Sequence, residues 1–339
     1  MDSNASHSTS ETETILGLDV GGSKIVVVEG TREARILQRH EIPTEGVRPF
    51  EQTFKRICSL AEETRVAAAG AGRNIIAISA SVPGPLRIKQ GIFVDPPNLM
   101  GWHGIHFKDR LAQRFYGVPV FIEHDGNAGA LAEFHFGVGR ASTPAGLPRW
   151  GRQLGGAELQ HLIFLTCGTG MGAGLIVNGR IVHGASDTAG EVGHLRIAED
   201  GPRVFGKQGS FEGLAAGIGM IELARLRFPQ RWTQESSIRK LVDAMLADDA
   251  DALTIALEAG QALGRGLALL VDALNPQVIV LGVLAVVLGE RLLAPARRVL
   301  AEEALPQGIA ACEILPAVLG KGIGDVAALM AALTQPDLF

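Results

Sequence analysis

The sequence predicts an α/β protein built from two similar domains, and three observations support this fold class. The chain has 339 residues, which is long for a single hydrophobic core. Residues 15–30 (ILGLDVGGSKIVVVEG) form an apolar strand, a glycine turn and a β-branched strand, and residues 162–179 (LIFLTCGTGMGAGLIVNG) repeat this pattern. Strand patterns alternate with helical patterns elsewhere. Two such halves facing each other would form a central cleft, a natural ligand site.

The first half is expected to hold further strands and helices between the two copies of the repeat. The strands lie near residues 35–41, 74–80 and 118–123. The helices lie near residues 50–69 and 126–136, where Pro49 and Asp125 are typical starting residues.

The second half continues the alternation after the second copy. Short strands are expected near residues 181–183 and 194–198, and longer ones near 277–282 and 311–315. Helices are expected near residues 212–227, 235–247, 251–274, 290–303 and 322–334. The predicted organisation is a disordered tail (1–14), an N-terminal domain (15–124), a C-terminal domain (125–315) and a last helix (316–339) that packs back on the N-terminal domain.

Composition and charge exclude several classes of partner. The formal net charge is −5 and no basic stripe is present, which argues against nucleic acid and anionic membranes. The apolar run from Val278 to Leu288 is too short to cross a bilayer, and residues 1–14 lack the apolar core of a signal peptide. Cys58, Cys167 and Cys312 are scattered in apolar stretches, which predicts free thiols in a reducing compartment, the cytoplasm.

The two glycine turns are candidate phosphate sites. GTGMGA at 168–173 fits the dinucleotide pattern G-x-G-x-x-A, but that pattern requires a helix after the turn. A strand, residues 175–177, follows instead. Such a turn can present several backbone N–H groups to a phosphate chain, whereas tight hairpins without a ligand are the alternative. The matching copies favour phosphate, and the candidate nucleotide contacts are Gly21, Gly22, Ser23, Lys24, Thr166, Gly168, Thr169 and Gly170.

Asp19 ends the strand before the first turn. A carboxylate at this place could hold Mg²⁺ through water, because Mg²⁺ dehydrates reluctantly. The alternative is an ordinary turn residue. For Lys24, the alternative to a phosphate contact is a solvated side chain.

Asp125 lies where an apolar strand ends and a helix begins. One interpretation is a helix N-cap, for which aspartate is a preferred residue. The other is a catalytic base that orients a hydroxyl and accepts its proton during phosphoryl transfer. The two roles are compatible, since a helix N-terminus also favours an ionised carboxylate.

Glu191, His194 and Glu212 are candidate ligands of a polyol. Glu191 and His194 are three residues apart, which places them on one side of a helical turn. Glu212 follows at a predicted helix start. Carboxylates with a histidine suit vicinal hydroxyls, which both donate and accept hydrogen bonds. A surface Glu–His pair and a helix-start carboxylate remain the alternatives.

Together these segments resemble the ROK family of repressors, open reading frames and kinases, from about residue 15 to the C-terminus. LDVGGSK and LTCGTGMGAG are similar to the two phosphate turns of the family, and EHDGNAGALAE is similar to the segment that carries its catalytic aspartate, here Asp125. VPGP and PPNLMGW are similar to its sugar-side loops, which implies that Gly84 and Asn98 contact the sugar. AGEVGH and FEG resemble the segments with its sugar ligands, here Glu191, His194 and Glu212.

The resemblance implies an actin/hexokinase-type (ribonuclease H-like) fold with a duplicated two-domain core. It implies a hexose kinase that uses ATP and Mg²⁺ and phosphorylates the 6-hydroxyl, most simply of glucose, and it implies a homodimer. Gly282 is expected on the adenine side. Other hexoses, N-acetylhexosamines and a polyphosphate donor remain alternatives. So does a non-catalytic sugar sensor, whereas DNA repression is not expected because no helix-turn-helix precedes the first strand.

The sequence departs from the family pattern at three places. The thiolates of the family's zinc site are replaced by Arg203, Phe205 and Ser210, so we predict that no zinc binds and that Phe205 packs in its place. His124 stands where the family usually has asparagine, which bears on the identity of the sugar. Val283 stands where the family often has glycine, which bears on the phosphoryl donor.

Overall fold

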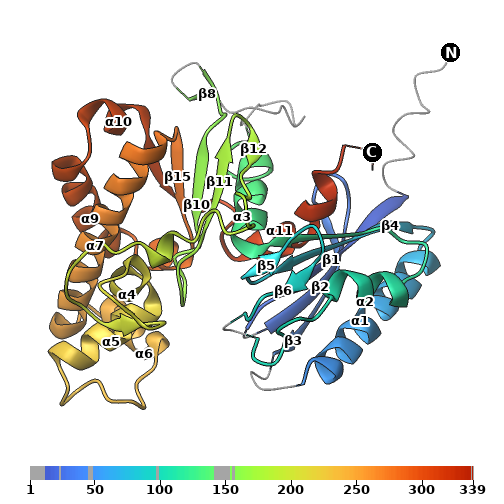
Figure 1. Ribbon diagram of the computed structural model, residues 1–339, viewed down its shortest axis with the longest axis horizontal. Helices are drawn as coiled ribbons and strands as arrows, with labels where there is room; N and C mark the ends of the chain where they lie inside the picture. The colour runs from blue at the N-terminus through green and yellow to red at the C-terminus, as the bar shows by residue number, and fades with distance from the viewer. Residues whose placement is uncertain are drawn as a thin grey trace. The chain divides into compact units, whose positions relative to one another are not determined.

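The computed structural model describes residues 12–22, 24–44, 49–96, 99–140, 153–154, 157–336 and 338. The chain divides into two compact units (Figure 1). Unit 1 consists of Met1–Ala132, His183–Thr188 and Lys321–Phe339, and unit 2 of Glu133–Val182 and Ala189–Gly320. The two-domain α/β organisation is therefore confirmed. The division falls between Ala132 and Glu133, inside helix α3 (Asp125–His135), so most of this helix belongs to unit 1.

Unit 1 contains a five-stranded sheet in the order β3-β2-β1-β4-β7. Strands β1 (Glu13–Val20), β2 (Lys24–Gly30) and β3 (Ile36–Pro43) form an antiparallel meander. Strands β4 (Asn74–Val82) and β7 (Val120–His124) extend the sheet in parallel with β1. A small hairpin, β5 (Leu86–Arg87) and β6 (Ile92–Phe93), follows β4.

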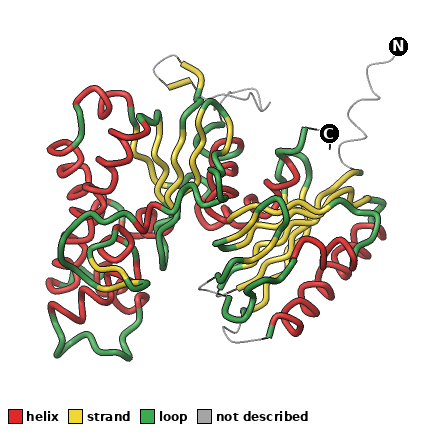
Figure 2. The backbone as a smooth tube through the Cα atoms, in the orientation of Figure 1, coloured by secondary structure: helices red, strands yellow, loops and turns green. Residues whose placement is uncertain are grey.

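Helices cover both faces of this sheet (Figure 2). Alternate residues of β1 explain how, since successive side chains of a strand point to opposite faces. Leu16 and Leu18 join the cluster with the apolar sides of α1 (Phe50–Gly70) and α2 (Phe107–Arg114). Ile15 instead packs with Ala328 and Leu329 of α11 (Ile323–Leu333). The C-terminal helix is thus part of unit 1.

Unit 2 repeats the topology of unit 1. Its five-stranded sheet has the order β12-β11-β10-β15-β16, formed by Leu162–Leu165 (β10), Ala173–Val177 (β11), Arg180–Ile181 (β12), Val278–Leu281 (β15) and Glu313–Pro316 (β16). The first three strands are again an antiparallel meander, and the last two are again parallel to its first strand. The duplication predicted from the repeated strand–turn–strand pattern is therefore present.

Helices α4 (Phe211–Ala215), α5 (Gly217–Arg227), α6 (Ile238–Leu246), α7 (Ala250–Leu274), α8 (Val283–Leu288), α9 (Glu290–Glu303) and α10 (Pro306–Ala311) complete unit 2. The pair α7 and α9 packs closely because of two glycines. A Cβ atom at Gly260 would lie 2.6 Å from the Leu292 carbonyl oxygen, and one at Gly264 would lie 2.5 Å from that of Ala296. Short pieces are η1 (Val192–His194), η2 (Gly320–Gly322) and the hairpins β8–β9 (Gln153–Leu154, Ala157–Glu158) and β13–β14 (Arg203–Val204, Lys207–Gln208).

Two sequence predictions of secondary structure differ from the structure. The strand expected near 194–198 is wrong: this segment forms only a single bridge between Arg196 and Ser210, because η1 bends the backbone immediately before it. Helices α2, α8 and α10 were not predicted, since all three are short and bury few side chains. The three cysteines are free thiols, with Cys58 and Cys167 buried.

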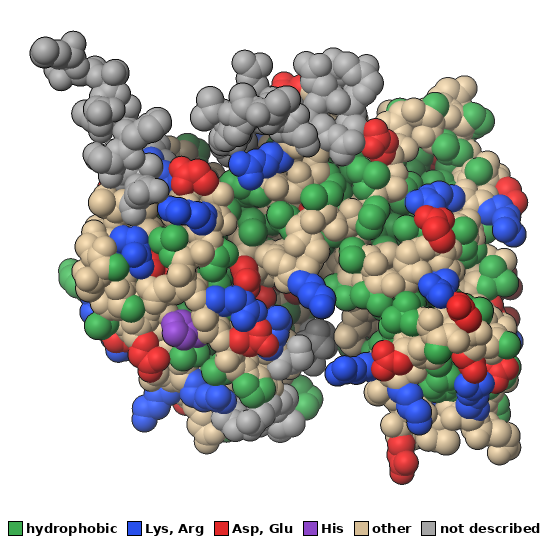
Figure 3. All heavy atoms as spheres, turned by 180° about the vertical axis from the view of Figure 1, so that it is seen from behind, with side chains coloured by type: hydrophobic (Ala, Val, Ile, Leu, Met, Phe, Trp, Pro, Cys, Tyr) green, Lys and Arg blue, Asp and Glu red, His purple; other side chains and the backbone are tan. Residues whose placement is uncertain are grey.

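The surface agrees with the mixed charge of the sequence. On the face drawn in Figure 3, acidic and basic side chains are interspersed, and the basic ones do not merge into a continuous stripe. Within the part of the chain that the structure describes, no helix combines the length and apolar character needed to cross a membrane.

Candidate active site

Three predicted site segments of unit 1 meet at one edge of its sheet. Asp19 is paired in register with Ser81 of β4, and Val82 is paired with His124 of β7. Because β1, β4 and β7 run parallel, their carboxyl ends share this edge, where α/β sheets commonly bind ligands. The VPGP loop leaves β4 here through a cis Gly84–Pro85 peptide bond. Asn98, the other predicted sugar contact of unit 1, lies outside the described residues.

Asp19 is surrounded by negative charge. The pKa of its carboxyl is raised to about 7, mainly by burial and also by the carboxylates of Asp125 and Asp325, against the opposing effect of Lys24 and Arg39. Neighbouring acids without enough compensating charge fit a cation, since an opposite charge would restore the ionised form. The described residues contain no group of three or more His, Cys, Asp or Glu side chains arranged as a metal cage. A lone carboxylate in such surroundings is of the kind that holds Mg²⁺ largely through water and phosphate, because Mg²⁺ dehydrates reluctantly.

Asp325 and Gly324, at the start of α11, were missed by the sequence prediction. A Cβ atom at Gly324 would lie 2.7 Å from Asp19 Oδ2, so only glycine lets this carboxylate pack against the helix start. The Asp325 carboxylate in turn accepts from Arg39 Nε, at 2.9 and 3.1 Å to its two oxygens. Nothing near Asp19 in sequence signals these contacts, because more than 300 residues separate the segments.

The first glycine turn is closed by its own backbone. The Gly21 N–H donates to the Lys24 carbonyl oxygen at 2.9 Å, and Thr44 Oγ1 donates to the Gly21 carbonyl at 2.8 Å. The Gly21 N–H is therefore occupied, which leaves Gly22 as the described candidate donor, while Ser23 lies outside the described residues. Lys24 is exposed and lies 3.4 Å from Glu41, as a solvated ion pair would.

Asp125 begins helix α3 and keeps 47% of its side chain exposed. Its Oδ1 accepts from the Gly126 N–H at 2.7 Å, so the carboxylate takes part in holding the helix start. His124 Nδ1 accepts from the same N–H at 3.2 Å, which leaves the Nε2–H of the His124 ring as a donor. Both interpretations of Asp125 therefore remain compatible: it holds the helix start, and one side of its carboxylate is accessible.

The second glycine turn joins β10 to β11 in unit 2. Thr166 closes it twice: its N–H donates to the Gly172 carbonyl at 3.0 Å, and its hydroxyl oxygen accepts from the Gly172 N–H at 3.0 Å. Gly168 N–H donates to Gly170 O at 3.1 Å. Over the described residues, the N–H groups of Thr169 and Gly170 have no hydrogen-bond partner. These two groups, rather than the Thr166 hydroxyl, are the donors left for a phosphate.

The start of α5 packs directly on this turn, a contact that the sequence prediction did not include. Gly217 N–H donates to Gly168 O at 2.9 Å, and Ile218 N–H donates to Thr169 O at 2.8 Å. A Cβ atom at Gly217 would lie 3.0 Å from Gly168 O, so the glycine permits this approach. The N-terminal N–H groups of α5 therefore fix the carbonyl oxygens of the turn.

The predicted polyol ligands gather beside the same turn. Glu191 precedes the 3-10 turn η1 and His194 is its last residue, and the His194 N–H donates to Glu191 O at 3.2 Å. Glu212 lies in α4, only 6% exposed, and a Cβ atom at Gly170 would lie 3.5 Å from its Oε2. Burial and the Glu191 charge raise the pKa of Glu212, whereas His194 and the Met171 backbone lower it. The structure thus brings these groups of unit 2 together.

Gly282 lies against the second turn from the end of β15. Its N–H donates to Leu165 O at 2.8 Å, and a Cβ atom there would lie 2.0 Å from the Thr166 carbonyl oxygen. This glycine is therefore required by backbone packing, a reason that the sequence prediction did not give. Val283 follows as the first residue of α8 and is 59% exposed.

The packing predicted for Phe205 is wrong. Phe205 occupies the tip of the β13–β14 hairpin with φ +44° and is 50% exposed, because the two-residue turn points its side chain away from the core. Ser210 has the structural role instead, since its buried hydroxyl accepts from the Gly213 N–H at 3.2 Å and caps α4. The absence of zinc stays a prediction.

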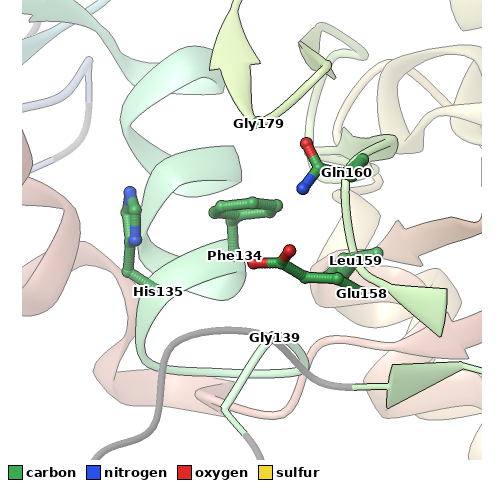
Figure 4. Close-up of a pocket in the computed structure, with 7 residues that line it drawn as sticks. All are labelled: Phe134, His135, Gly139, Glu158, Leu159, Gln160 and Gly179. Carbon is green, nitrogen blue, oxygen red and sulfur yellow. The ribbon is translucent and has the colours of Figure 1, made fainter. Parts of the chain in front are cut away.

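One described cavity of unit 2 lies away from these groups (Figure 4). The cavity measures about 180 Å³, and the side chains of Phe134, Glu158 and Gln160 converge on it. Gln160 precedes β10 and Gly179 joins β11 to β12, so the cavity lies at the amino end of β10. The second glycine turn lies at the carboxyl end, and the cavity contains none of the predicted site residues.

The duplicated α/β fold, with two five-stranded sheets of the same topology, is of the actin/hexokinase type. The family model described as "ROK family" matches residues 15–335, and the chain belongs to the ROK family. The glucokinase of Halalkalibacterium halodurans is 27% identical over 323 residues, 92% of each chain. Xylose repressors are also among the curated relatives.

Solved structures agree with this assignment. The ROK hexokinase from Thermus thermophilus has a TM-score of 0.71 and 32% identity, covering 94% of this chain and 98% of that one. The ROK family glucokinase from Streptomyces griseus, in complex with glucose and AMPPNP, has a TM-score of 0.72 and 26% identity, covering 93% and 97%. The chain is therefore a ROK protein with the fold of the family's sugar kinases.

Proposed function

We propose that the protein is an ATP-dependent sugar kinase that transfers the γ-phosphoryl group to the 6-hydroxyl of a hexose, with glucose as the first candidate. The observation that carries the proposal is the pair of acids, Asp19 and Asp125, at the carboxyl edge of the unit 1 sheet. Phosphoryl transfer requires both a group that orients the hydroxyl and a means of neutralising phosphate charge. The related glucokinases and the AMPPNP complex of one of them support the nucleotide donor.

Asp125 is proposed as the base. Its partly exposed carboxylate accepts the proton of the attacking hydroxyl as the bond to phosphorus forms, and ADP leaves with the electrons of the broken P–O bond. The residues proposed to contact the sugar are His124, Gly84, Asn98, Glu191, His194 and Glu212. Gly22, Ser23, Lys24, Thr169 and Gly170 would contact the phosphates, and Gly282 would lie on the adenine side.

Asp19 is the residue proposed to hold Mg²⁺, through water. The ion would neutralise charge on the phosphates when bound. Mg²⁺ sites with a single protein carboxylate are common in kinases, because water and substrate phosphates complete the coordination. We also propose that the protein is a homodimer and that it is located in the cytoplasm. Light scattering on the purified protein tests the dimeric state.

The test of this function is a phosphorylation screen. Common hexoses and N-acetylhexosamines are each offered with ATP or with polyphosphate, and sugar phosphate is quantified directly. We expect transfer from ATP to glucose in the presence of Mg²⁺. Transfer to another hexose, or from polyphosphate, would replace that part of the proposal. Tight sugar binding with no transfer from either donor would contradict the kinase and favour a sugar sensor, as the repressor relatives allow.

The buried Glu212 should make sugar binding dependent on pH. The pKa of the Glu212 carboxyl is raised in the free protein, so its ionisation requires a higher pH than usual. Folding stability is therefore lost as the pH rises through that pKa. Sugar hydroxyls that donate to the carboxylate favour its ionised form, so binding should release protons and become tighter with rising pH. Glu212→Gln should weaken binding by roughly 10-fold or more, the loss of one charge-assisted hydrogen bond.

Isothermal titration calorimetry in buffers of different ionisation enthalpy measures this proton release. The exposed Glu199 offers a matched control, Glu199→Gln, which should keep the affinity and the proton release of the original protein. Unchanged proton release in Glu212→Gln would remove Glu212 from the proposed site.

A further inference from the structure

Glu123, two residues before Asp125, has a buried carboxylate that accepts hydrogen bonds from the residue before Asp125 and from a residue after it. Only 8% of its side chain is exposed. Its Oε1 accepts from the His124 backbone N–H at 2.9 Å and from Asn127 Nδ2 at 2.9 Å. The carboxylate thus holds the backbone before Asp125 and a side chain after it. Whatever orients Glu123 therefore also orients the start of α3.

The partner of the other oxygen is His183, whose Nε2 lies 2.8 Å from Glu123 Oε2. His183 begins a segment, His183–Thr188, that belongs to unit 1 although the chain on both sides of it belongs to unit 2. We call this segment the strap. At its other end Asp187 Oδ2 accepts from the Ile88 N–H at 3.0 Å. The strap is therefore attached to unit 1 at two points, near β7 and after β5.

The pair differs from an ordinary surface pair in the same unit. His106 and Asp109 are three residues apart at the start of α2, with 57% and 61% of their side chains exposed and 3.3 Å between His106 Nδ1 and Asp109 Oδ2. The contact between His183 and Glu123 is shorter, joins residues 60 positions apart and involves a buried carboxylate. A buried carboxylate that loses one partner keeps its desolvation cost, so it changes position or protonation state.

We propose that His183 is a positioning residue for phosphoryl transfer: by hydrogen bonding to Glu123 it fixes the carboxylate that orients His124 and Asp125. The inference rests on the proposed kinase function, because it assigns a role in that reaction. His183 acts through Glu123 and the start of α3, and it needs no contact with the substrate. Sub-ångström placement matters here, since a misplacement of about 1 Å can cost roughly 10²-fold in rate.

The charges around His183 give the bond a pH dependence. The groups that face the ring are Glu123 on β7, Asp187 in the strap and Lys89 in the turn after β5. The hydrogen bond to Glu123 raises the pKa of His183, and burial and Lys89 oppose this. Because the pKa of His183 is raised, the protonated ring and its charged hydrogen bond to Glu123 are fully present below the ordinary histidine pKa of about 6.5. The charge is lost, and the bond weakens, as the pH rises through the raised pKa.

Three variants test the role in the full-length protein. His183→Leu removes the bond, His183→Gln keeps a neutral donor near the position of Nε2, and His106→Leu is the matched control at the exposed pair. We expect His183→Leu to lower kcat roughly 10-fold to 100-fold with little change in the sugar Kd, and His183→Gln to recover most of kcat at pH 8. At pH 6 His183→Gln should fall further behind the original protein, which then has the charged bond.

His106→Leu should leave kcat and its pH profile unchanged. A thermal unfolding midpoint is measured for every variant, and if His183→Leu does not fold, the pH profile of His183→Gln decides. Parallel pH profiles for His183→Gln and the original protein, or equal kcat in His183→Leu, would overturn the proposal.

A second measurement is independent of kinase activity. The pKa of His183 is followed by NMR in the original protein and in Glu123→Gln. We expect a value above the usual one in the original protein and a return toward it in Glu123→Gln. An ordinary value in both would overturn the inference whatever the activity. A raised value in a protein that phosphorylates no sugar would instead locate the failure in the proposed function.

Discussion

Replacing Asp125 with alanine is expected to lower kcat by roughly 10² to 10⁴-fold, the usual contribution of a positioned proton acceptor. The sugar Kd should change much less, because the proposed sugar ligands Glu191, His194 and Glu212 remain. Asp125→Asn should be about as inactive as Asp125→Ala, since the amide cannot accept the proton. A coupled assay for ADP with saturating hexose measures the rate, and calorimetry measures sugar binding.

The control for Asp125 separates catalysis from helix capping. Asp109 lies in the first turn of α2 as Asp125 lies in the first turn of α3, and it is exposed. Asp109→Asn therefore makes the same change at a helix start that takes no part in the site. It should keep the activity of the original protein. If Asp125→Asn retained near-normal turnover as well, Asp125 would be only a helix-start residue.

Replacing Asp19 with asparagine is expected to lower the rate with Mg-ATP roughly 10²-fold, because stabilisation of phosphate charge by a bound metal is worth several kcal/mol. The substitution keeps the size of the side chain and removes its charge. It should also remove the Mg²⁺-dependent increase in thermal stability. Both are measured in a Mg²⁺ titration, one by initial rate and the other by the unfolding midpoint.

The pH dependence of the same variant has a definite sign. The pKa of Asp19 is raised to about 7, so in the free protein its ionisation costs stability as the pH rises toward neutrality. Asp19→Asn should lack this loss and be the more stable protein at pH 8 without Mg²⁺. Asp243→Asn, on the exposed side of α6, serves as the control. Equal Mg²⁺ responses in Asp19→Asn and the original protein would contradict the metal assignment.

Residues that follow strands of the repeat were predictable because local sequence determines where a strand ends. Asp19 at the end of β1, Asp125 after β7 and the turn from Thr166 to Gly172 all follow apolar β-branched runs, and the structure puts them at carboxyl edges of the two sheets. The role of individual donors was not predictable in this way. Gly21, Thr166 and Gly168 were expected to face phosphate, yet their N–H groups make hydrogen bonds within the turns themselves.

Phe205 is a residue whose position could not be predicted from its type. Its apolar character predicts burial, but one residue of a tight hairpin turn must adopt a positive φ, and the backbone there directs the ring outward. Gly282 was predicted for the nucleotide, whereas its close contact with the Thr166 carbonyl gives it a packing reason of its own. In both cases the environment of the side chain depends on backbone geometry, which cannot be read from the type of residue.

The sequence by itself determined the duplicated α/β fold, the family and the positions of the two glycine turns, because strand periodicity and turn residues act over a few neighbours. Only the tertiary structure decided which distant groups support them. Asp325 and Gly324 pack against Asp19, α5 holds the second turn, and His183 reaches Glu123. These contacts join residues tens to hundreds of positions apart, and their hydrogen-bond and packing energies exist only once the sheets have formed.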